Sequence, residues 1–345
     1  MKAIVWTEYG SPDVLQLKDI QKPIPKDNEM LIRIVATTAT SGDCEMRGLS
    51  GARWYTPVIC AYVGLTTPRR IKILGMELAG VVESIGKDVK LFKAGDHVFA
   101  ATSFANMGTY AEYITLPETS TDGVVAIKPS NMTFQEAAAV PVGGLEALHF
   151  IRQAHIQTGQ KILINGAGGT IGTFAVQLAK YFGAEVTGVD STEKLEMLRL
   201  LGADHTLDYT QEDFTTNGLT YDVILDMIGK GSYSRIVRSL KPNGRLLFVN
   251  PNVLQMIRGR WTSMTDNRKV KFSAVHQTTE DLNFLKEMIQ AGKIKSVIDR
   301  CYPLQQTAEA HRYIETGRKK GHIIITMEQS LRILENTSYL KPQEF

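Results

Sequence analysis

The chain has 345 residues, of which 43% are hydrophobic and 22% are charged, and its net charge is +3. This length suits two domains with separate cores, and the small net charge argues against nucleic acid as a partner. Three scattered cysteines, Cys44, Cys60 and Cys301, are too few for a disulfide framework and fit a reducing cytoplasm. The chain opens without a signal-peptide pattern, and its longest nearly uncharged apolar stretch, 57–67, is too short to span a bilayer. We therefore expect a cytoplasmic protein with no membrane partner.

The first part of the chain consists of short strand-like runs separated by turns. The runs are 2–6, 30–36, 79–85 and 110–114. They predict a β-rich barrel or folded sheet. Segment 116–129 contains Pro, Ser, Thr and Gly but few large apolar residues, which predicts a domain boundary near residue 125.

The middle of the chain changes to an α/β pattern. Thr133 and Glu136 have capping-box spacing, so a helix begins there, and we expect it to break near Pro141 and Gly143. From residue 161, strand-like runs alternate with helical stretches, which predicts a doubly wound parallel sheet. The expected strands are 161–166, 185–190, 205–209, 221–227, 244–250 and, closing the sheet, 270–275.

The last part of the chain is expected to return to the first domain. It contains helical patterns over 280–291 and 307–316 and a strand over 322–326. The predicted fold class is therefore α/β, with a β-rich domain and a doubly wound sheet. The predicted domains are 1–125, β-rich; 126–265, α/β; 266–327, returning to the first domain; and 328–345, a tail of unassigned use.

The glycine-rich segment between 161 and 172 carries the strongest functional signal. A strand-length apolar run precedes Gly166, Gly169 and Gly172, and a helix with a buried stripe follows. In a Rossmann turn, such glycines provide the tight bend, the close approach of a pyrophosphate and the packing of helix on strand. The N–H groups at the start of the helix attract the phosphates. This arrangement predicts dinucleotide binding.

Taken together, these segments resemble the medium-chain dehydrogenase/reductase superfamily, in its zinc-independent, quinone-oxidoreductase-like branch. The resemblance extends from residue 1 to about 327. Its markers are 73–82, 94–98, 137–141, the glycine turn and 201–204. It implies a GroES-like catalytic domain with an inserted Rossmann domain, and a homodimer.

The departures from the zinc-dependent relatives decide the expected chemistry. Thr40, Met76 and Val142 stand at the positions that match the three zinc ligands. A hydroxyl, a thioether and an isopropyl group do not make a catalytic zinc site, so we expect no metal. Without a Lewis acid, saturated alcohols are poor substrates. Quinones and α,β-unsaturated carbonyls are easier to reduce without a metal, because delocalisation spreads the negative charge that develops during hydride transfer. We therefore expect hydride transfer from a reduced nicotinamide to a quinone or an enone.

Three residues of the first domain are candidates for the catalytic site. Thr40 occupies a former zinc-ligand position, and Tyr55 lies in a loop that covers this pocket in the family. Packing of Tyr55 in that loop is an equally good interpretation. For Asp43, a structural role as a carboxylate that fixes the loop is a better interpretation than a catalytic role. Glu77, beside Met76, is interpreted as orienting the cofactor or a loop arginine.

The cofactor preference remains open between NADPH and NADH. Asp190 ends the second strand of the expected Rossmann domain, where a carboxylate usually binds the adenosine ribose of NAD. Ser191, Thr192, Lys194 and Tyr209 resemble the phosphate-binding set of NADPH-using relatives, so we favour NADPH. The expected cofactor contacts are Gly166, Gly168, Gly169, Thr170, Ile171, Gly172, Asp190, Ser191, Thr192, Lys194, Tyr209 and Asn250.

Two other functions remain as alternatives. An NAD(P)-dependent alcohol dehydrogenase requires a metal whose ligands are missing. A non-catalytic, dinucleotide-binding redox sensor is compatible with the fold, because function depends on the site rather than on the architecture.

Overall fold

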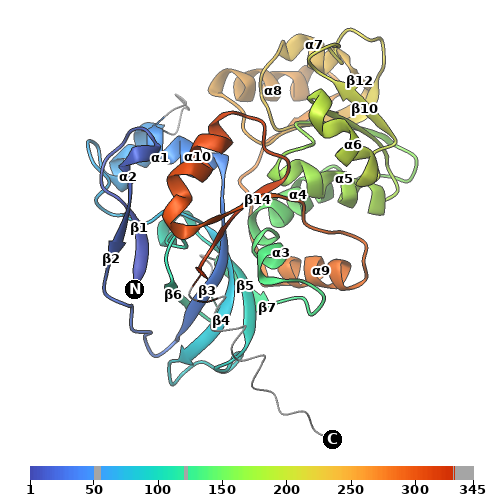
Figure 1. The fold of residues 1–345 in the computed structure, drawn as a ribbon. Helices are drawn as coiled ribbons and strands as arrows, with labels where there is room; N and C mark the ends of the chain where they lie inside the picture. Colours follow the sequence, from blue (N-terminus) through green and yellow to red (C-terminus); the bar gives the residue numbers. More distant parts are fainter. Residues whose placement is uncertain (50–55, 120–122, 329, 331–345) are drawn as a thin grey trace, which may run out of the picture. The chain divides into compact units, whose positions relative to one another are not determined.

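The computed structural model describes residues 1–49, 56–119, 123–328 and 330. The chain forms two compact units (Figure 1). The first comprises Met1–Val142, Thr278–Gln290 and Ile298–Phe345, and the second comprises Gly143–Gln277 and Ala291–Val297. The predicted α/β fold class is confirmed, because the first unit is β-rich and the sheet of the second is parallel throughout. None of the described helices is both long and apolar enough to cross a membrane.

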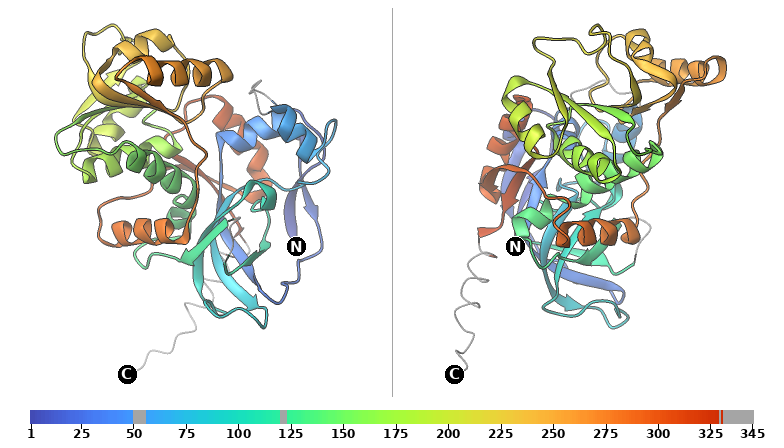
Figure 2. Two further views of the ribbon diagram at one scale, coloured as in Figure 1. Left: turned by 180° about the vertical axis from the view of Figure 1, so that it is seen from behind. Right: turned by 90° about the vertical axis from the view of Figure 1, so that its right-hand side faces the viewer.

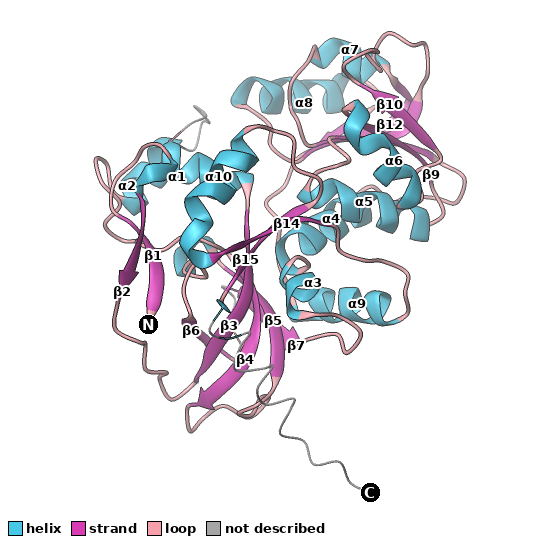
Figure 3. Cartoon of the chain, in the orientation of Figure 1, coloured by secondary structure: helices cyan, strands magenta, loops and turns pink. Residues whose placement is uncertain are grey.

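The first unit is built on a seven-stranded sheet in the order β14-β15-β3-β4-β5-β7, with β6 also paired to β3. Its strands are β3 (Glu29–Ala39), β4 (Glu77–Ile85), β5 (His97–Thr102), β6 (Tyr113–Pro117), β7 (Gly123–Ile127), β14 (Ile298–Pro303) and β15 (His322–Thr326). Figure 3 shows β3, β4, β5 and β7 running side by side. All of these pairs are antiparallel except β14 with β15. A separate antiparallel pair joins β1 (Lys2–Trp6) and β2 (Leu15–Asp19).

Helices from both ends of the chain belong to this unit. They are α1 (Ser41–Gly48), α2 (Thr56–Val63), α3 (Phe134–Ala138), α9 (Thr279–Gln290) and α10 (Thr307–Glu315), with the 3-10 turns η1 (Pro12–Val14), η2 (Phe104–Asn106) and η3 (Leu304–Gln306). Helix α9 packs beside β7, although more than 150 residues of chain separate them (Figure 2). Helices α3 and α10 both contact β15, which explains why its three consecutive isoleucines, Ile323, Ile324 and Ile325, are fully buried.

The second unit contains a six-stranded parallel sheet in the order β10-β9-β8-β11-β12-β13. Its strands are β8 (Lys161–Asn165), β9 (Glu185–Asp190), β10 (His205–Asp208), β11 (Tyr221–Asp226), β12 (Leu240–Phe248) and β13 (Lys269–Lys271). Its helices are α4 (Pro141–Gln153), α5 (Thr170–Tyr181), α6 (Thr192–Leu200), α7 (Tyr233–Arg238) and α8 (Val253–Thr265). Numbered from β8, the strand order is 3-2-1-4-5-6, which is the Rossmann arrangement.

The first unit differs from the expected elements at three points. The run 110–114 is not a strand from its start, since β6 begins at Tyr113 and Ala111 forms only an isolated bridge with Ala3. The backbone groups of Tyr110 pair elsewhere, since its N–H donates to the Leu74 carbonyl at 3.0 Å and its carbonyl accepts from the Ile4 N–H at 2.8 Å. Segment 116–129, expected at a boundary, includes β7, which pairs with β5. Helices α1 and α2 and strand β14 were not expected.

The second unit also differs in detail from the expected elements. The expected break near Pro141 is confirmed, since α3 ends at Ala138 and α4 begins at Pro141, where proline is accommodated at a helix start, and α4 then continues through Gly143 and Gly144. The units change between Val142 and Gly143 and again after Gln277, rather than near residues 125 and 265. Strand β12 ends at Phe248 and β13 covers only Lys269–Lys271, so both end earlier than expected.

Candidate functional site

The turn between β8 and α5 has the geometry that a pyrophosphate site needs. Gly166 adopts φ = +88°, a conformation that disfavours side chains. A Cβ on Gly172 would lie 2.4 Å from the carbonyl oxygen of Gly166, so only glycine lets α5 start this close to the turn. Gly169 caps α5, and Thr170, Ile171 and Gly172 form its first turn, whose N–H groups point along the helix axis. The residues present therefore fit a dinucleotide phosphate.

The carboxylate of Asp190 is built into this turn. Its Oδ2 accepts a hydrogen bond from the Gly168 N–H at 2.8 Å, and its Oδ1 accepts one from the Ser191 N–H at 2.9 Å. The ammonium of Lys194 lies 2.9 Å from Oδ1, and both side chains are more than 90% buried. The Asp190 carboxylate is therefore buried and compensated, and it does not point into solvent.

The other three residues expected near the adenosine ribose have different surroundings. The Thr192 hydroxyl donates a hydrogen bond to the Asp208 carboxylate, which also accepts from the N–H and hydroxyl of Thr210 at 2.9 and 2.7 Å. Ser191 caps α6 without a side-chain cap bond. Tyr209 is 61% exposed, and its N–H donates to the Asp190 carbonyl at 3.2 Å. Ser191 and Tyr209 therefore flank the Asp190–Lys194 pair, whereas the Thr192 hydroxyl is directed to Asp208.

A second carboxylate at the same sheet edge was missed in the sequence. Asp226 ends β11 next to Asn165, which ends β8, and the Asn165 amide donates to its Oδ1 at 2.9 Å. The same oxygen accepts from the N–H groups of Ile228 and Gly229 at 3.0 and 3.1 Å. Burial raises the pKa of Asp226. Asp226 thereby holds the loop after β11 over Gly166. Asp226 could have been found from the sequence, because it ends a predicted strand in the same way as Asp190 does.

Asn250 lies two residues beyond the end of β12 and is exposed. The Asn250 carbonyl oxygen would lie 3.3 Å from a Cβ on Gly229. This places the backbone of Asn250 against the loop that Asp226 holds, at the carboxyl edge of the sheet where ligands bind in such folds.

In the first unit, a buried carboxylate joins two of the segments that match zinc-ligand positions in zinc-dependent relatives. Thr40 caps α1, and its hydroxyl donates to Asp43 Oδ2 at 2.6 Å and accepts from the Asp43 N–H at 3.2 Å. Asp43 Oδ1 accepts from the N–H of Gly75, next to Met76, at 3.1 Å. Burial raises the pKa of Asp43. The contacts of Asp43 are those of a loop-fixing carboxylate.

Glu77 makes the corresponding link to the third position. Its buried carboxylate accepts a hydrogen bond from the Val142 N–H at 2.7 Å and another from the Thr38 hydroxyl. The anionic group lies at the start of α4, where the helix dipole stabilises it. Thr40, Met76 and Val142 are therefore held in one hydrogen-bonded framework. They provide no thiolate or imidazole, so the residues do not fit a catalytic zinc.

A buried tyrosine–histidine pair continues this framework, and sequence reasoning missed it. The Tyr110 hydroxyl lies 3.1 Å from His311 Nε2, and both side chains are fully buried. Burial lowers the pKa of His311 to about 3, so this imidazole is neutral. Burial and the nearby Asp43 raise the pKa of Tyr110 well above its ordinary value. Neither group exchanges a proton near neutral pH. Tyr55, the remaining candidate, lies outside the described residues.

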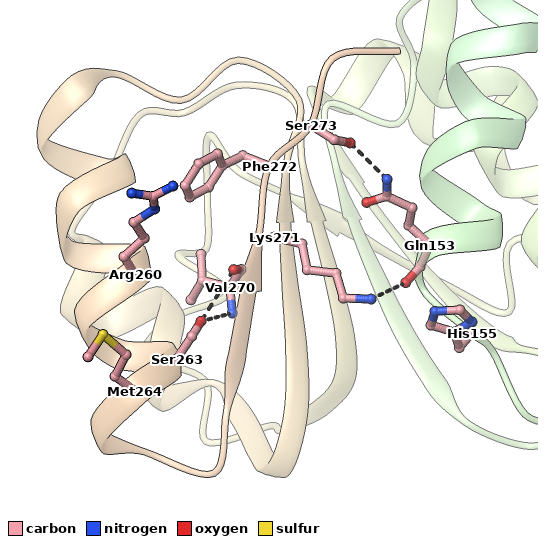
Figure 4. Close-up of a pocket in the computed structure, with 9 residues that line it drawn as sticks. All are labelled: Gln153, His155, Arg260, Ser263, Met264, Val270, Lys271, Phe272 and Ser273. Atoms are coloured by element: carbon pink, nitrogen blue, oxygen red, sulfur yellow. Dashed lines mark hydrogen bonds between the residues drawn. The ribbon is translucent and has the colours of Figure 1, made fainter. Parts of the chain in front are cut away.

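The second unit also has a hollow along the outer edge of β13, between α8 and the end of α4 (Figure 4). Lys271 crosses it to donate to the Gln153 carbonyl at 3.1 Å, and the Gln153 amide donates to Ser273 at 2.8 Å. Arg260 and Met264 of α8 line the opposite wall. No carboxylate lines this hollow among the described residues.

Comparison with known proteins matches two segments of the chain to protein families. Residues 26–129 match the family described as alcohol dehydrogenase GroES-like domain, and residues 201–325 match that described as zinc-binding dehydrogenase. The chain is 33% identical over 336 residues to 2-methylene-furan-3-one reductase of Solanum lycopersicum, spanning 94% of this chain and 79% of that protein. It is 32% identical over 337 residues to the chloroplastic NADPH-dependent alkenal/one oxidoreductase of Arabidopsis thaliana, spanning 94% and 79% of the two chains.

A solved structure gives the same assignment. The quinone oxidoreductase from Coxiella burnetii superposes with a TM-score of 0.83 at 27% identity, covering 95% of this chain and 99% of that one. The glycine turn and the strand order support the same conclusion, so the predicted resemblance is confirmed. The chain belongs to the medium-chain dehydrogenase/reductase superfamily, in its quinone-oxidoreductase-like branch, and is an oxidoreductase.

Proposed function

We propose that this enzyme reduces quinones or α,β-unsaturated carbonyls with NADPH and without a catalytic metal. The observation that carries the proposal is the framework around Thr40, Met76 and Val142, which keeps the position of the family's metal but provides no ligands for one. The names of the relatives, a furanone reductase, an alkenal/one oxidoreductase and a quinone oxidoreductase, support this substrate class.

The residues of the glycine turn would hold the dinucleotide. The first turn of α5 would bind its pyrophosphate, and Ser191 and Tyr209 would bind the adenosine ribose. Because Lys194 and two N–H groups compensate the Asp190 carboxylate, that carboxylate repels a 2′-phosphate less than a free one would. This supports NADPH, with NADH as the weaker cofactor.

The bound cofactor supplies a hydride. On the substrate side, the Thr40 hydroxyl would donate a hydrogen bond to the substrate oxygen instead of to the Asp43 carboxylate. Asp43 would keep the Thr40 loop in position. Tyr55 is the second proposed donor. Hydrogen bonds to the developing oxyanion are the type of stabilisation that replaces a Lewis acid.

Glycine substitution tests the cofactor half of the proposal. Gly172→Ala forces a Cβ against the Gly166 carbonyl, so α5 must move away from the turn. We expect loss of NADPH binding, measured by quenching of protein fluorescence, with the fold retained by circular dichroism. The matched control is Gly42→Ala in α1, where a Cβ would lie 3.5 Å from the Thr40 hydroxyl oxygen, an ordinary contact. Unchanged binding in Gly172→Ala would place the dinucleotide elsewhere.

We also propose a homodimer formed through the edge of the second unit. Strand β13 ends the parallel sheet, and no described strand pairs with its outer edge. Helix α8 beside it exposes an apolar stripe at helical spacing: Leu254 (62%), Ile257 (62%), Trp261 (68%) and Met264 (82%). Stripes of this kind beside an open strand edge are usually covered by a partner. In a symmetric dimer, the β13 edge and the α8 stripe of one copy would lie against the same edge and stripe of the other copy, so both features would be covered in each copy.

The oligomeric state is measured by light scattering on the full chain. We expect a dimer for the wild type and a monomer for Trp261→Glu, because a charge would be buried in the apolar contact. Leu200→Glu is the matched control, since Leu200 is 73% exposed on α6, outside the stripe. A monomeric wild type, or a dimeric Trp261→Glu, would contradict this interface.

A further inference from the structure

The hydroxyl proton of Thr192 is used inside the protein, although the residue is at the surface. Thr192 is the exposed first residue of α6, two residues beyond Asp190 at the end of β9. Its hydroxyl donates a hydrogen bond to the carboxylate of Asp208, a residue that is only 9% exposed. A threonine hydroxyl has one proton to donate. While that proton is given to Asp208, the Thr192 oxygen can only accept hydrogen bonds from a ligand.

The parallel sheet places Asp208 for this contact. Asp208 ends β10 and pairs in register with Asp190, so the carboxyl ends of the two strands lie side by side. Helix α6 packs against both strands, and Thr192 at its start lies at the same edge (Figure 3). In a Rossmann fold, the adenosine ribose binds at the end of this second strand. In the proposed cofactor site, Thr192 therefore lies beside the ribose.

The Asp208 carboxylate orients a second exposed hydroxyl in the same way. Thr210 donates its hydroxyl at 2.7 Å and its N–H at 2.9 Å to Oδ1, and the Gln211 amide donates to Oδ2 at 3.1 Å. The hydrogen bond from Thr192 and those from Thr210 lower the pKa of Asp208, so its carboxyl is ionised at neutral pH. Among the described residues, its partners are hydroxyl, amide and N–H donors, without a Lys, Arg or His side chain. Asp208 is therefore an anion that no described cation pairs with.

The two nicotinamide cofactors differ only in the group on the 2′-carbon of this ribose. The free 2′-hydroxyl of NADH has a proton, which it can donate to the Thr192 oxygen. The 2′-phosphate of NADPH is a phosphate monoester with a charge of about −1.5 to −2 at neutral pH, and its oxygens act as acceptors. Such a phosphate meets an acceptor where it needs a donor, and a carboxylate lies one hydrogen bond behind that acceptor. The arrangement therefore favours the ribose without a phosphate.

We propose that Asp208 is a positioning residue that limits the preference for NADPH, an inference that rests on the proposed cofactor and its site. It acts through Thr192, because by accepting the hydroxyl proton it keeps this side chain an acceptor for a ribose hydroxyl. Its effect opposes that of Lys194, whose ammonium is the cation at the same edge. The balance between Asp208 and Lys194 sets how strongly the site prefers NADPH over NADH.

Asp208→Asn tests the assignment. The Asn amide can still accept from Thr210, and its NH2 group can donate to the Thr192 oxygen, which frees the Thr192 proton for a phosphate. The measurement is the Kd of the full chain for NADPH and for NADH, by titration calorimetry without substrate. We expect the ratio Kd(NADH)/Kd(NADPH) to rise about tenfold, the size expected for one hydrogen bond to a charged group.

The matched control is Asp213→Asn. Asp213 is exposed and accepts from the N–H and the hydroxyl of Thr215 at 2.9 and 2.7 Å, so it forms the same turn as Asp208 does with Thr210. The control therefore removes the same charge from the same local structure without touching Thr192. We expect it to leave the ratio of the two Kd values unchanged.

Thr192→Val shows whether Asp208 acts through Thr192, and it provides the test if Asp208→Asn does not fold. Valine has the shape of threonine without the hydroxyl, so the acceptor for the ribose hydroxyl is lost. We expect the same ratio to rise about fivefold, the value of one ordinary hydrogen bond, through weaker NADH binding. In the double variant the ratio should stay within about twofold of that in Thr192→Val, because residues that act as a unit are not additive. Independent effects that multiply would overturn the assignment.

The role of Asp208 and the proposed function fail in different ways. If the wild type binds both dinucleotides and the ratio is the same in Asp208→Asn, the role of Asp208 is overturned and the proposed function stands. Equal weakening of both affinities in Asp208→Asn and in Thr192→Val would show a merely structural role and would overturn the inference as well. If the wild type binds neither NADPH nor NADH, the proposed function fails, and the role of Asp208 fails with it.

Discussion

The ammonium of Lys194 lies 2.9 Å from the carboxylate of Asp190, and the pair is buried beside the glycine turn. One helical turn separates the two residues, so the start of α6 positions the cation directly over the end of β9. In the proposed cofactor site, this pair would set the charge beside the adenosine ribose. This chain, which is similar to an NADPH-dependent enzyme, thus carries an acidic residue at the position typical of NAD sites, with its charge balanced by Lys194.

Removing the carboxylate should increase the preference for NADPH. In Asp190→Ser the Lys194 ammonium is released from its partner and faces a 2′-phosphate alone. Unit charges about 4 Å apart interact by roughly 1–4 kcal/mol near a protein surface, so we expect the NADPH/NADH ratio of kcat/KM to rise about tenfold. Lys194→Ala should lower the same ratio. Equal ratios in Asp190→Ser and the wild type would show that this pair does not discriminate the cofactors.

Acid should destabilise the fold through His311. Its pKa is lowered to about 3 by burial, whereas an unfolded histidine titrates near 6.5, so its contribution is present above pH 6.5 and is lost as the pH falls. Between pH 6.5 and 5 the loss is about 2 kcal/mol in the free energy of unfolding. His311→Gln retains an acceptor for the Tyr110 hydroxyl but does not titrate. Urea unfolding at several pH values should therefore give a flatter pH dependence for this variant, and parallel curves would contradict the assignment.

Glu146 should lower stability at alkaline pH. Its pKa is about 7 in the folded chain against an ordinary value of 4.5, so its contribution is favourable below pH 4.5 and is lost as the pH rises through 7. Glu146→Gln removes this loss. Relative to the wild type, the variant should gain about 1–2 kcal/mol between pH 4 and pH 8, a value reduced for the partial exposure of the side chain. Thermal unfolding at the two pH values measures the difference, and no difference would mean that the carboxyl is well solvated.

The fold was predictable where the signal is local. The apolar run 322–326 and the glycine turn carry their strand and helix patterns within a few residues, and β15 and α5 form there. Strand β14 was missed because its sequence, Ile298–Pro303, has no alternation of apolar and polar residues. In the structure its residues are exposed or half-buried. It is held instead by its parallel pairing with β15, more than 20 residues later.

The candidate site shows the same limit. Asp190 and Lys194 could be named from the sequence, but their mutual burial depends on α6 packing over β9 and was not predictable. Tyr110 and His311 are 201 residues apart in the chain, so only the folded structure brings them together.

Reduction of quinones or enones without a metal is tested most directly by chelator-treated protein. The measurement follows the oxidation of NADPH and of NADH with a small panel of quinones and α,β-unsaturated carbonyls. We expect turnover that is faster with NADPH and unaffected by added zinc. Activity on saturated alcohols that requires zinc would contradict this function, and tight dinucleotide binding without any turnover would identify a sensor instead.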